Sequence, residues 1–376
     1  MKVLVTGGAG FVGSHTVDLL LSQGIDVLVV DNLDPQAHTS AAESPINLRP
    51  HLSHPGLTFI RGDVRDKDLL TRAMRDADAV LHLAAAVGVG QSMYEPLYYC
   101  DANVTGTATL LQVALDARRH LRKVVVASSM SIYGEGSYEC IRCEETPAIR
   151  PDSLRSAGRW EPVCPACLSP LSSRPTAETK PLEPTSIYAI TKRVQEEMAL
   201  CFGRAYHVPT IALRYFNIFG ARQSMDNPYT GALAIFLSRL LNGKPPLVFE
   251  DGLQSRDFIH VHDIARANVR AVTTDRTECV ALNVGTGRPT TVLTLARSLA
   301  DELGVAIEPE VLHRFRTGDV RHCYADITEI RRHLGWEPAV SLRDGVRDLV
   351  AWAGDRRPRD RVEEAVKELA QQGLVR

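Results

Sequence analysis

A tyrosine and a lysine lie four residues apart, at Tyr188 and Lys192 in the segment SIYAITKRVQEE. The segment has a helical pattern, and residues four apart on a helix face the same way. A free tyrosine loses its proton at about pH 10, and a lysine ammonium group one turn away favours the phenolate. The pair could therefore serve as a general base near neutral pH. An exposed aromatic–lysine pair without a chemical role is the alternative interpretation.

Hydroxyl side chains follow the apolar run 123–127, in the order Ser128-Ser129-Met130-Ser131. The run has the character of a buried strand, and parallel sheets bind ligands at the carboxyl ends of their strands. This context favours a catalytic interpretation of Tyr188 and Lys192.

Three glycines, Gly7, Gly10 and Gly13, directly follow the first apolar run. Glycines there allow a tight turn and a close approach of the backbone to a pyrophosphate, which binds the amide groups at the start of the next helix. A tight turn that binds nothing is the alternative interpretation. Their place between a strand and a helix favours the pyrophosphate and hence a dinucleotide cofactor.

Two aspartates follow the second and third apolar runs and bear on the choice of cofactor. Asp31 can accept hydrogen bonds from both hydroxyl groups of an adenosine ribose and would repel a 2′-phosphate, which predicts NAD rather than NADP. Asp63 could reach the adenine amino group, or it could equally cap the next helix.

Four cysteines form two C-x2-C pairs, Cys140 with Cys143 and Cys164 with Cys167. Each pair can offer two thiolates to one ion, and Zn²⁺ is the usual occupant of this spacing. Two disulfides or four free thiols are the alternatives, and an intracellular setting disfavours disulfides. Four thiolates fill a tetrahedral shell, so the predicted zinc ion is structural.

The elements that must position these groups begin with short, β-branched apolar runs at residues 2–6, 26–30, 57–61, 79–83 and 123–127. Helical stretches alternate with them, a pattern typical of a doubly wound parallel sheet of the Rossmann type in the α/β class. A helix is expected near 187–206 and a strand over 209–214.

We expect a Rossmann domain over residues 1–213, completed by part of 256–284, and a smaller α/β domain over 214–376. The segment 136–184, which carries the four cysteines, has no periodicity and is expected to form a zinc-knuckle-like insert outside the main fold. His260 and His262 are expected on one face of a strand, where packing is a better interpretation than metal binding.

The charges are balanced, with 43 Lys and Arg against 45 Asp and Glu among 376 residues, a formal net charge of −2. This balance argues against a protein that coats nucleic acid or an anionic membrane. No apolar run is long enough to span a bilayer, and the first residues do not form a signal peptide. We therefore expect a cytoplasmic protein with a small-molecule ligand.

Several motifs resemble the extended short-chain dehydrogenase/reductase family, the NAD-dependent nucleotide-sugar epimerases and dehydratases. They are TGGAGFVGSH, HLAA, ASSMSIYG, YAITK, LRYFNIFG and SRDFIHVHDIA, in family order along nearly the whole chain. The resemblance implies that Tyr188 is the catalytic base, that Lys192 holds the nicotinamide ribose and that Ser129 binds the reacting sugar hydroxyl.

The same resemblance implies further ligands. NAD would contact Gly7, Gly10, Phe11, Val12, Gly13, Asp31, Asn32, Asp63, Val64, Leu83, Ala84, Ala85, Asn103, Tyr188 and Lys192. The nucleotide-diphosphate sugar would contact Ser129, Ser131, Asn217, Arg256 and Arg321, with residues 214–376 as the substrate domain. Arginine suits a diphosphate because its planar fork meets the oxygens in pairs. A homodimer is implied as well, through the helices near 103–118 and 187–206.

The residues that follow Ser129 bear on which family reaction the chain performs. Dehydratases place an acidic pair where this chain has Met130 and Ser131, and neither residue can move the required protons. A 4-epimerase needs no such pair, and the four-cysteine insert resembles the members that act on dTDP-L-rhamnose. A UDP-hexose 4-epimerase, a dehydratase or reductase, and a non-enzymatic NAD or zinc sensor are the alternatives.

Overall fold

The computed structural model describes residues 1–38, 44–143, 150–354 and 356–376. Seven parallel strands form the main sheet in the order β12-β8-β5-β4-β1-β2-β3. Their bounds are β1 Lys2–Thr6, β2 Asp26–Asp31, β3 Leu57–Arg61, β4 Ala79–His82, β5 Lys123–Ser129, β8 Thr210–Tyr215 and β12 Val280–Val284. The prediction of a doubly wound sheet is therefore confirmed, and each predicted strand agrees with the observed one to within two residues.

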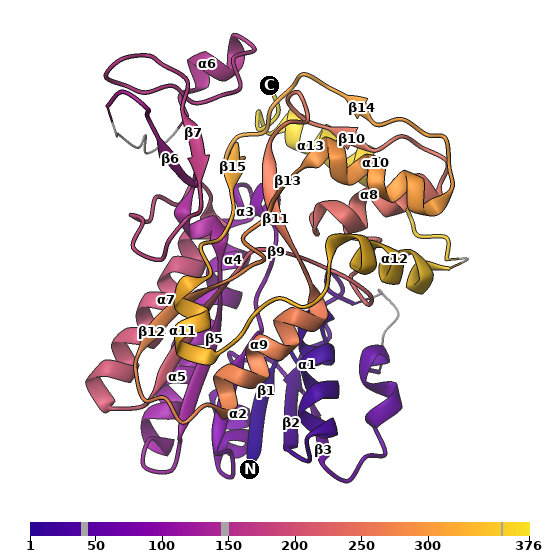
Figure 1. The fold of residues 1–376 in the computed structure, drawn as a ribbon. Helices are drawn as coiled ribbons and strands as arrows, with labels where there is room; N and C mark the ends of the chain where they lie inside the picture. Colours follow the sequence, from indigo (N-terminus) through magenta and orange to yellow (C-terminus); the bar gives the residue numbers. More distant parts are fainter. Residues whose placement is uncertain (39–43, 144–149, 355) are drawn as a thin grey trace.

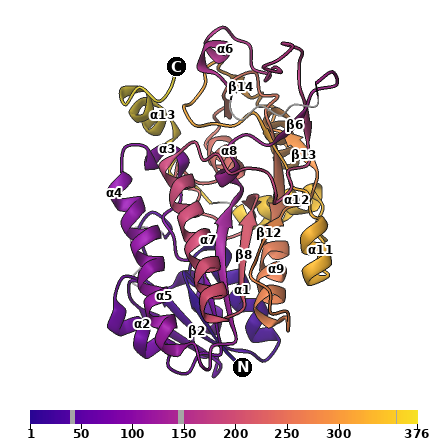
Figure 2. The ribbon, with the colours of Figure 1, turned by 90° about the vertical axis from the view of Figure 1, so that its left-hand side faces the viewer.

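Helices cover both faces of this sheet, as Figures 1 and 2 show. One face packs against α1 (Phe11–Ser22) and α9 (Val261–Thr273). The other packs against α2 (Lys67–Met74), α5 (Gly106–Ala117) and α7 (Ile187–Tyr206). The buried strands have apolar side chains on both faces because each face is covered by helices. The main sheet includes β12, so a segment of the chain well after residue 214 also belongs to this sheet.

Helix α7, which carries Tyr188 and Lys192, has the predicted bounds and clear local reasons for them. At its start the Ser186 hydroxyl accepts a hydrogen bond from the Ala189 N–H group, which caps the helix. At its end His207 adopts a left-handed conformation with φ of 56°. The helix packs against β5, the strand that ends at Ser129.

A second, smaller unit lies above the carboxyl ends of the main strands (Figure 1). Its mixed sheet consists of β9 (Asn217–Phe219), β11 (Ser255–His260), β13 (Pro289–Thr291) and β15 (His322–Cys323). Its core also holds α8 (Ala232–Leu241), α10 (Val292–Leu303) and α12 (Leu342–Ala353), while β10 (Leu247–Val248) pairs with β14 (Glu310–Val311). Helices α11 (Thr328–Leu334) and α13 (Val362–Gln371) belong to the last part of the chain.

The cysteine insert forms its own small structure beside these two units. Strands β6 (Ser137–Glu139) and β7 (Ser172–Arg174) pair antiparallel, and α6 (Asp152–Ser156) lies between them in sequence. Part of the insert, residues 144–149, lies outside the described residues. Among the described residues, no helix is both long enough and apolar enough to cross a membrane.

The prediction that His260 and His262 share one face of a strand is wrong. His260 ends β11, whereas His262 lies in the first turn of α9. Their rings lie 4.7 Å apart, and the His15 ring lies 5.0 Å from that of His262. Within the described residues these histidines do not form a group that could hold a metal ion.

Buried neutral histidines predict a loss of stability in acid. Burial lowers the pKa of His82 to about 3, and its ring nitrogens lie 2.7 and 3.0 Å from the Thr6 and Thr107 hydroxyls. Burial also lowers the pKa values of His15 and His260 to about 4. Because these values lie below the unfolded value of about 6.5, their contribution to stability is complete above pH 6.5. It is lost progressively as the pH falls toward 4.

We therefore expect the urea concentration at the midpoint of unfolding to decrease as the pH is lowered from about 6.5 to about 5. The His82→Gln variant should show a smaller decrease of this midpoint per pH unit. Glutamine can still bond both threonines but takes up no proton. His120→Gln, at an exposed site, is the matched control and should keep the wild-type slope. Equal slopes in wild type and His82→Gln would contradict the assignment of a neutral, buried His82.

Candidate active site

A cavity of about 480 Å³ lies at the carboxyl ends of the main strands, between the sheet and the second unit. It brings together most of the residues predicted from the sequence. Those that line it are Gly7, Gly10, Phe11, Val12, Gly13, Asp31, Asn32, Asp63, Val64, Leu83, Ala84, Ala85, Ser129, Ser131, Tyr188, Lys192 and Asn217. A single cavity therefore holds both the glycine turn and the tyrosine–lysine pair.

The glycine turn leaves no room for side chains. Gly7 has φ of +72°, and a Cβ atom there would lie 2.7 Å from the Ala84 backbone nitrogen. A Cβ atom on Gly13 would overlap the Gly7 carbonyl oxygen. Helix α1 then begins at Phe11 with no acidic residue in its first turn. Its free amide groups are suited to a pyrophosphate, so the turn fits a dinucleotide.

Asp31 ends β2 with its side chain buried at the wall of the cavity. Its carboxylate oxygens accept hydrogen bonds from the Ala9 and Leu33 N–H groups, at 3.0 and 2.9 Å. The His38 Nε2 atom lies 3.3 Å from Oδ1, and His38 also lines the cavity. Sequence analysis missed His38, which stands in a stretch without periodicity. These hydrogen bonds hold the carboxylate in place at the wall of the cavity.

Replacement of Asp31 should change the preference between NAD and NADP. In Asp31→Ala the ribose hydroxyls lose their acceptor, and a 2′-phosphate is no longer repelled. We expect NAD to bind more weakly and the ratio of NAD affinity to NADP affinity to fall, as measured by calorimetric titration of cofactor-free protein. Asp34→Ala is a matched control at the same cavity wall. An unchanged ratio in Asp31→Ala would show that Asp31 does not contact the ribose.

Asp63 lies in the cavity wall and does not cap the next helix. The cap of α2 is Asp66, whose side chain accepts from the Leu69 N–H group, so the capping alternative is wrong. The Arg65 guanidinium bonds both oxygens of Asp63 at 2.8 Å and lowers its pKa to about 2. The Asn32 amide donates to the same carboxylate.

Ser129, Tyr188 and Lys192 are almost fully buried and line the same cavity. Ser129 ends β5 in the middle of the sheet, whereas Asp63 follows β3 at the edge of the sheet. Burial raises the pKa of Tyr188, and a hydrogen bond with Ser129 opposes that rise. Burial lowers the pKa of Lys192 to about 7, against the attraction of the Glu196 carboxylate. Burial thus moves the two pKa values apart, because it disfavours the charged form of each group: the phenolate of Tyr188 and the ammonium group of Lys192.

Asn103 supports the site from behind rather than lining it. Its side-chain amide donates to the Ala86 carbonyl at 3.1 Å and to the Thr191 hydroxyl at 2.9 Å, and its oxygen accepts from the Ala86 N–H group. It therefore connects the segment after β4 to α7, the helix of Tyr188. Asn103 therefore positions neighbouring segments and does not itself line the cavity.

The two predicted arginines do not line the cavity. Arg256 donates to the backbone carbonyls of Ser255, Val320 and Arg321. The Arg321 side chain is fully buried among the carboxylates of Glu161, Glu250 and Asp251. Their positions do not support the expectation that these guanidinium groups contact the ligand, because both are occupied by other groups of the protein.

A polar segment between β9 and α8 completes the cavity and was missed by sequence analysis. It contributes Gln223, Ser224, Asn227, Tyr229, Thr230 and Gly231. Helix α8 starts at Ala232 without a side-chain cap or an acidic residue in its first turn. Two buried oxygens near it, Asn217 Oδ1 and Gln223 Oε1, have no hydrogen-bond partner among the described residues. The run of polar residues, ARQSMDNPYTG, was the available signal.

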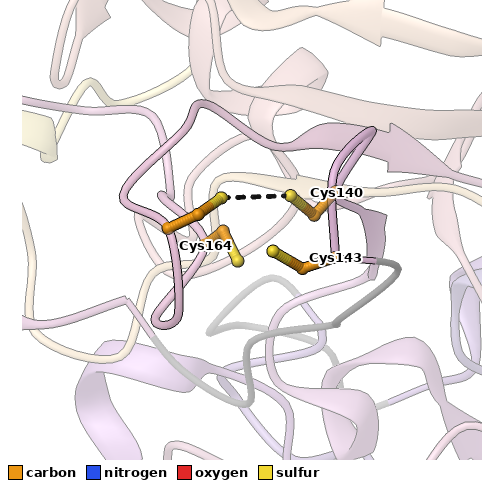
Figure 3. A group of neighbouring side chains, drawn as sticks. Cys140, Cys143 and Cys164 are labelled. Carbon is orange, nitrogen blue, oxygen red and sulfur yellow. Dashed lines mark hydrogen bonds between the residues drawn. The ribbon is translucent and has the colours of Figure 1, made fainter.

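The four cysteines come together in one cluster. Figure 3 shows three of them, Cys140, Cys143 and Cys164, with their side chains close together. Their sulfur atoms all lie within 4.8 Å of one another, with those of Cys140 and Cys167 at 3.6 Å. Four sulfurs at about 2.3 Å from one zinc ion lie about 3.8 Å apart. All four cysteines are free thiols rather than disulfides, and hydrogen bonds from Ser169 lower the pKa of Cys167 to about 6. The donor set fits a tetrahedral metal ion.

Comparisons with known proteins agree with this geometry. The chain is 34% identical to dTDP-L-rhamnose 4-epimerase from Burkholderia thailandensis, over 93% of this chain and 94% of that protein. It is 33% identical to a putative UDP-glucose 4-epimerase from Methanocaldococcus jannaschii, over 93% of this chain and 97% of that protein. The structure of UDP-glucuronic acid 4-epimerase from Bacillus cereus, in complex with UDP-glucuronic acid and NAD, is similar with a TM-score of 0.77. The identity is 27%, and the alignment covers 94% of this chain and 98% of that one.

The family match extends through the Rossmann sheet and the cavity. Residues 3–156 and 163–285 match the NAD dependent epimerase/dehydratase family. These residues include the glycine turn, Ser129, and the Tyr188–Lys192 pair. The chain belongs to the NAD dependent epimerase/dehydratase family.

Proposed function

We propose that this protein is an NAD-dependent 4-epimerase of nucleotide-diphosphate sugars. It inverts C4 of a hexose through a transient 4-keto sugar, and NAD is restored in every cycle. The observation that carries the proposal is the meeting of Ser129, Tyr188 and Lys192 with the glycine turn in one cavity. The 4-epimerase names of several relatives support the same assignment.

The side chains divide the reaction between them. The glycine turn and Asp31 would hold NAD, whose nicotinamide would serve as the acceptor and later the donor of the C4 hydride. Tyr188 would take the proton of the C4 hydroxyl through its phenolate oxygen and give it back after the sugar turns over. Lys192 would hold the nicotinamide ribose and favour the phenolate, while Ser129 would bond the same sugar oxygen.

The acidic residues of the cavity favour epimerisation over dehydration. Met130 and Ser131 follow Ser129, and the acids among the described lining residues are Asp31, Asp34 and Asp63. All three lie at or just after the ends of β2 and β3, and each accepts hydrogen bonds from the protein. Asp31 accepts from backbone amides, Asp34 from the Tyr98 hydroxyl and Asp63 from the Arg65 guanidinium group. None is placed near Ser129 to protonate a leaving hydroxyl group.

The cations of the cavity favour a sugar without a carboxylate. Arg65 and Lys192 are the arginine and lysine side chains among the described lining residues. Arg65 is paired with Asp63, and Lys192 belongs to the proposed catalytic group. A uronic acid would lack a partner for its charge at C6. The diphosphate would instead bind the amide groups at the start of α8, beside Asn217.

We infer that the best substrate is a dTDP-6-deoxyhexose such as dTDP-L-rhamnose, with a UDP-hexose such as UDP-glucose as the second candidate. The relative from Burkholderia thailandensis supports the first and that from Methanocaldococcus jannaschii the second. A homodimer is also proposed, through α5 and α7. Ile190 and Tyr206 are exposed apolar residues of α7 that such an interface would cover.

We also propose one structural zinc ion per chain, bound by Cys140, Cys143, Cys164 and Cys167. The spacing of the sulfurs supports it, and four thiolates leave no position for a substrate oxygen. The ion would hold β6 and β7 together and would take no part in catalysis.

The test is a panel of dTDP-, UDP- and GDP-hexoses, with C4 stereochemistry followed by proton NMR. We expect inversion at C4 without accumulation of a keto sugar, and no stoichiometric change in absorbance at 340 nm. A steady rise or fall of that absorbance would identify a net oxidoreductase instead. Loss of water from the sugar would identify a dehydratase.

A further inference from the structure

A second cavity, separate from the active site, lies where the cysteine insert meets the end of the chain. It has a volume of about 500 Å³ and shares no lining residue with the first cavity. Figures 1 and 2 both show α6 at the same end of the molecule as β14 and the last residues. The lining residues are Arg155, Ser156, Gly158, Trp160, His313, Phe315 and Arg376.

The cavity wall is basic. It contains two arginines and a histidine, and none of its side chains is acidic. Asp152, just outside the wall, pairs with both Arg155 and Arg376. One aspartate side chain is therefore shared by two guanidinium groups.

Arg155 has a buried donor that no described residue of the chain uses. Its side chain is more than nine-tenths buried, and its Nε atom has no hydrogen-bond partner among the described residues. Its Nη1 atom makes only a long contact of 3.4 Å with the Arg316 carbonyl. An unpaired donor of a buried cation is costly, so Arg155 has hydrogen-bonding capacity that the described groups around it leave unused.

Aromatic side chains form the rest of the wall. The Arg155 guanidinium carbon lies 4.6 Å above the Phe315 ring, which holds it in place. The Trp160 and Phe315 rings meet edge to face, with centroids 6.4 Å apart. Trp160 is only half-buried, so part of its surface is available for stacking. A cavity wall that contains both arginines and an indole is suited to a flat ring that carries an anionic group.

We propose that this cavity binds a nucleoside phosphate, with the base against Trp160 and the phosphate at Arg155 and Arg376. The volume is within the range of small-molecule sites. The wall also connects with the active site through one loop. Phe315 precedes Gly318, whose carbonyl accepts a hydrogen bond of 2.9 Å from Thr185, just before α7. Occupancy could thus be communicated to the helix of Tyr188.

The test counts bound thymidine 5′-monophosphate per chain by equilibrium dialysis, in wild type and in variants of the full-length protein. Ser156→Trp should fill the cavity from an exposed position and remove one bound nucleotide per chain. Arg376→Ala should weaken that site about tenfold, as expected for a lost charge-assisted contact. Arg359→Ala, at an exposed arginine that does not line the cavity, changes the net charge equally and should have no effect.

The comparison of stoichiometries does not depend on whether the active site also binds the nucleotide. Unchanged stoichiometry in Ser156→Trp would overturn the proposal. Inorganic phosphate that displaces the nucleotide from this site at equal concentration would overturn the stacking of the base on Trp160. Trp160→Ala should weaken nucleotide binding and leave phosphate binding unchanged, and equal loss of both would also contradict the proposal.

Discussion

Tyr188→Phe is expected to lower the turnover of C4 inversion by at least about a hundredfold, the usual scale for loss of a general base. The substitution removes the phenol oxygen and leaves the ring, so the packing of α7 should be unchanged. NAD should remain bound, because the glycine turn and Asp31 do not contact the phenol. The measurement combines the NMR assay with chromatography of the nucleotide released on denaturation.

Tyr99→Phe is the matched control. Tyr99 is also buried, its ring centroid lies 6.4 Å from that of Tyr188, and its hydroxyl bonds Gln91 rather than the cavity. It loses the same atom in the same neighbourhood and should keep turnover within a few-fold of wild type. Turnover near wild type in Tyr188→Phe would remove Tyr188 from the mechanism, and equal losses in both variants would indicate a packing effect.

The strands of the main sheet and the helix of Tyr188 could be predicted because their signals are local. A strand buried on both faces is a continuous apolar run, and its carboxyl end is a fixed place for ligands. Ser129, Tyr188 and the glycine turn therefore came together as expected. Helix α7 agrees with its prediction because Ser186 provides a side-chain cap at its start.

The predictions that the structure does not support concern residues whose surroundings depend on distant parts of the chain. Arg321 was expected at a diphosphate, but Glu161 and Glu250 reach it from 160 and 71 residues away. The sequence around Arg321 contains no sign of these partners. His262 differs from the prediction because a strand changes to a helix after His260, where apolar alternation also fits a strand. The polar residues before α8 carry no periodicity at all.

The metal cluster could be predicted only in part from the cysteine pairs. The sequence shows two donor pairs, but only the pairing of β6 with β7 places them at one point. The buried apolar core of the insert is small, consisting of Tyr138, Cys140, Cys164 and Leu171. A core of this size does not stabilise a fold of its own, so the stability of the insert should depend on the metal.

Cys164→Ser should therefore remove the zinc. Wild-type protein purified without chelator is expected to hold about one zinc ion per chain, and the variant close to none. Three remaining thiolates bind weakly because they compete with protons at neutral pH. Cys201→Ser, at an exposed cysteine outside the cluster, is the control and should keep its zinc. Less than a few tenths of an equivalent in wild type, with all four thiols freely titratable, would contradict the site.

The consequences of zinc loss should be confined to the insert. Hydrogen exchange should speed up in the described parts of residues 136–184, most of all at β6 and β7, which the sulfurs join. Arg150 should limit the loosening, because its buried guanidinium pairs with Glu135 and with Glu250 of the second unit. The Rossmann sheet should keep its NAD, because the two core clusters on its faces contain none of the four metal-binding cysteines. Any loss of activity should appear mainly in KM, since the insert lies beside the second unit and not at Tyr188. A Cys164→Ser protein that binds substrate normally but cannot oxidise it would contradict a purely structural ion.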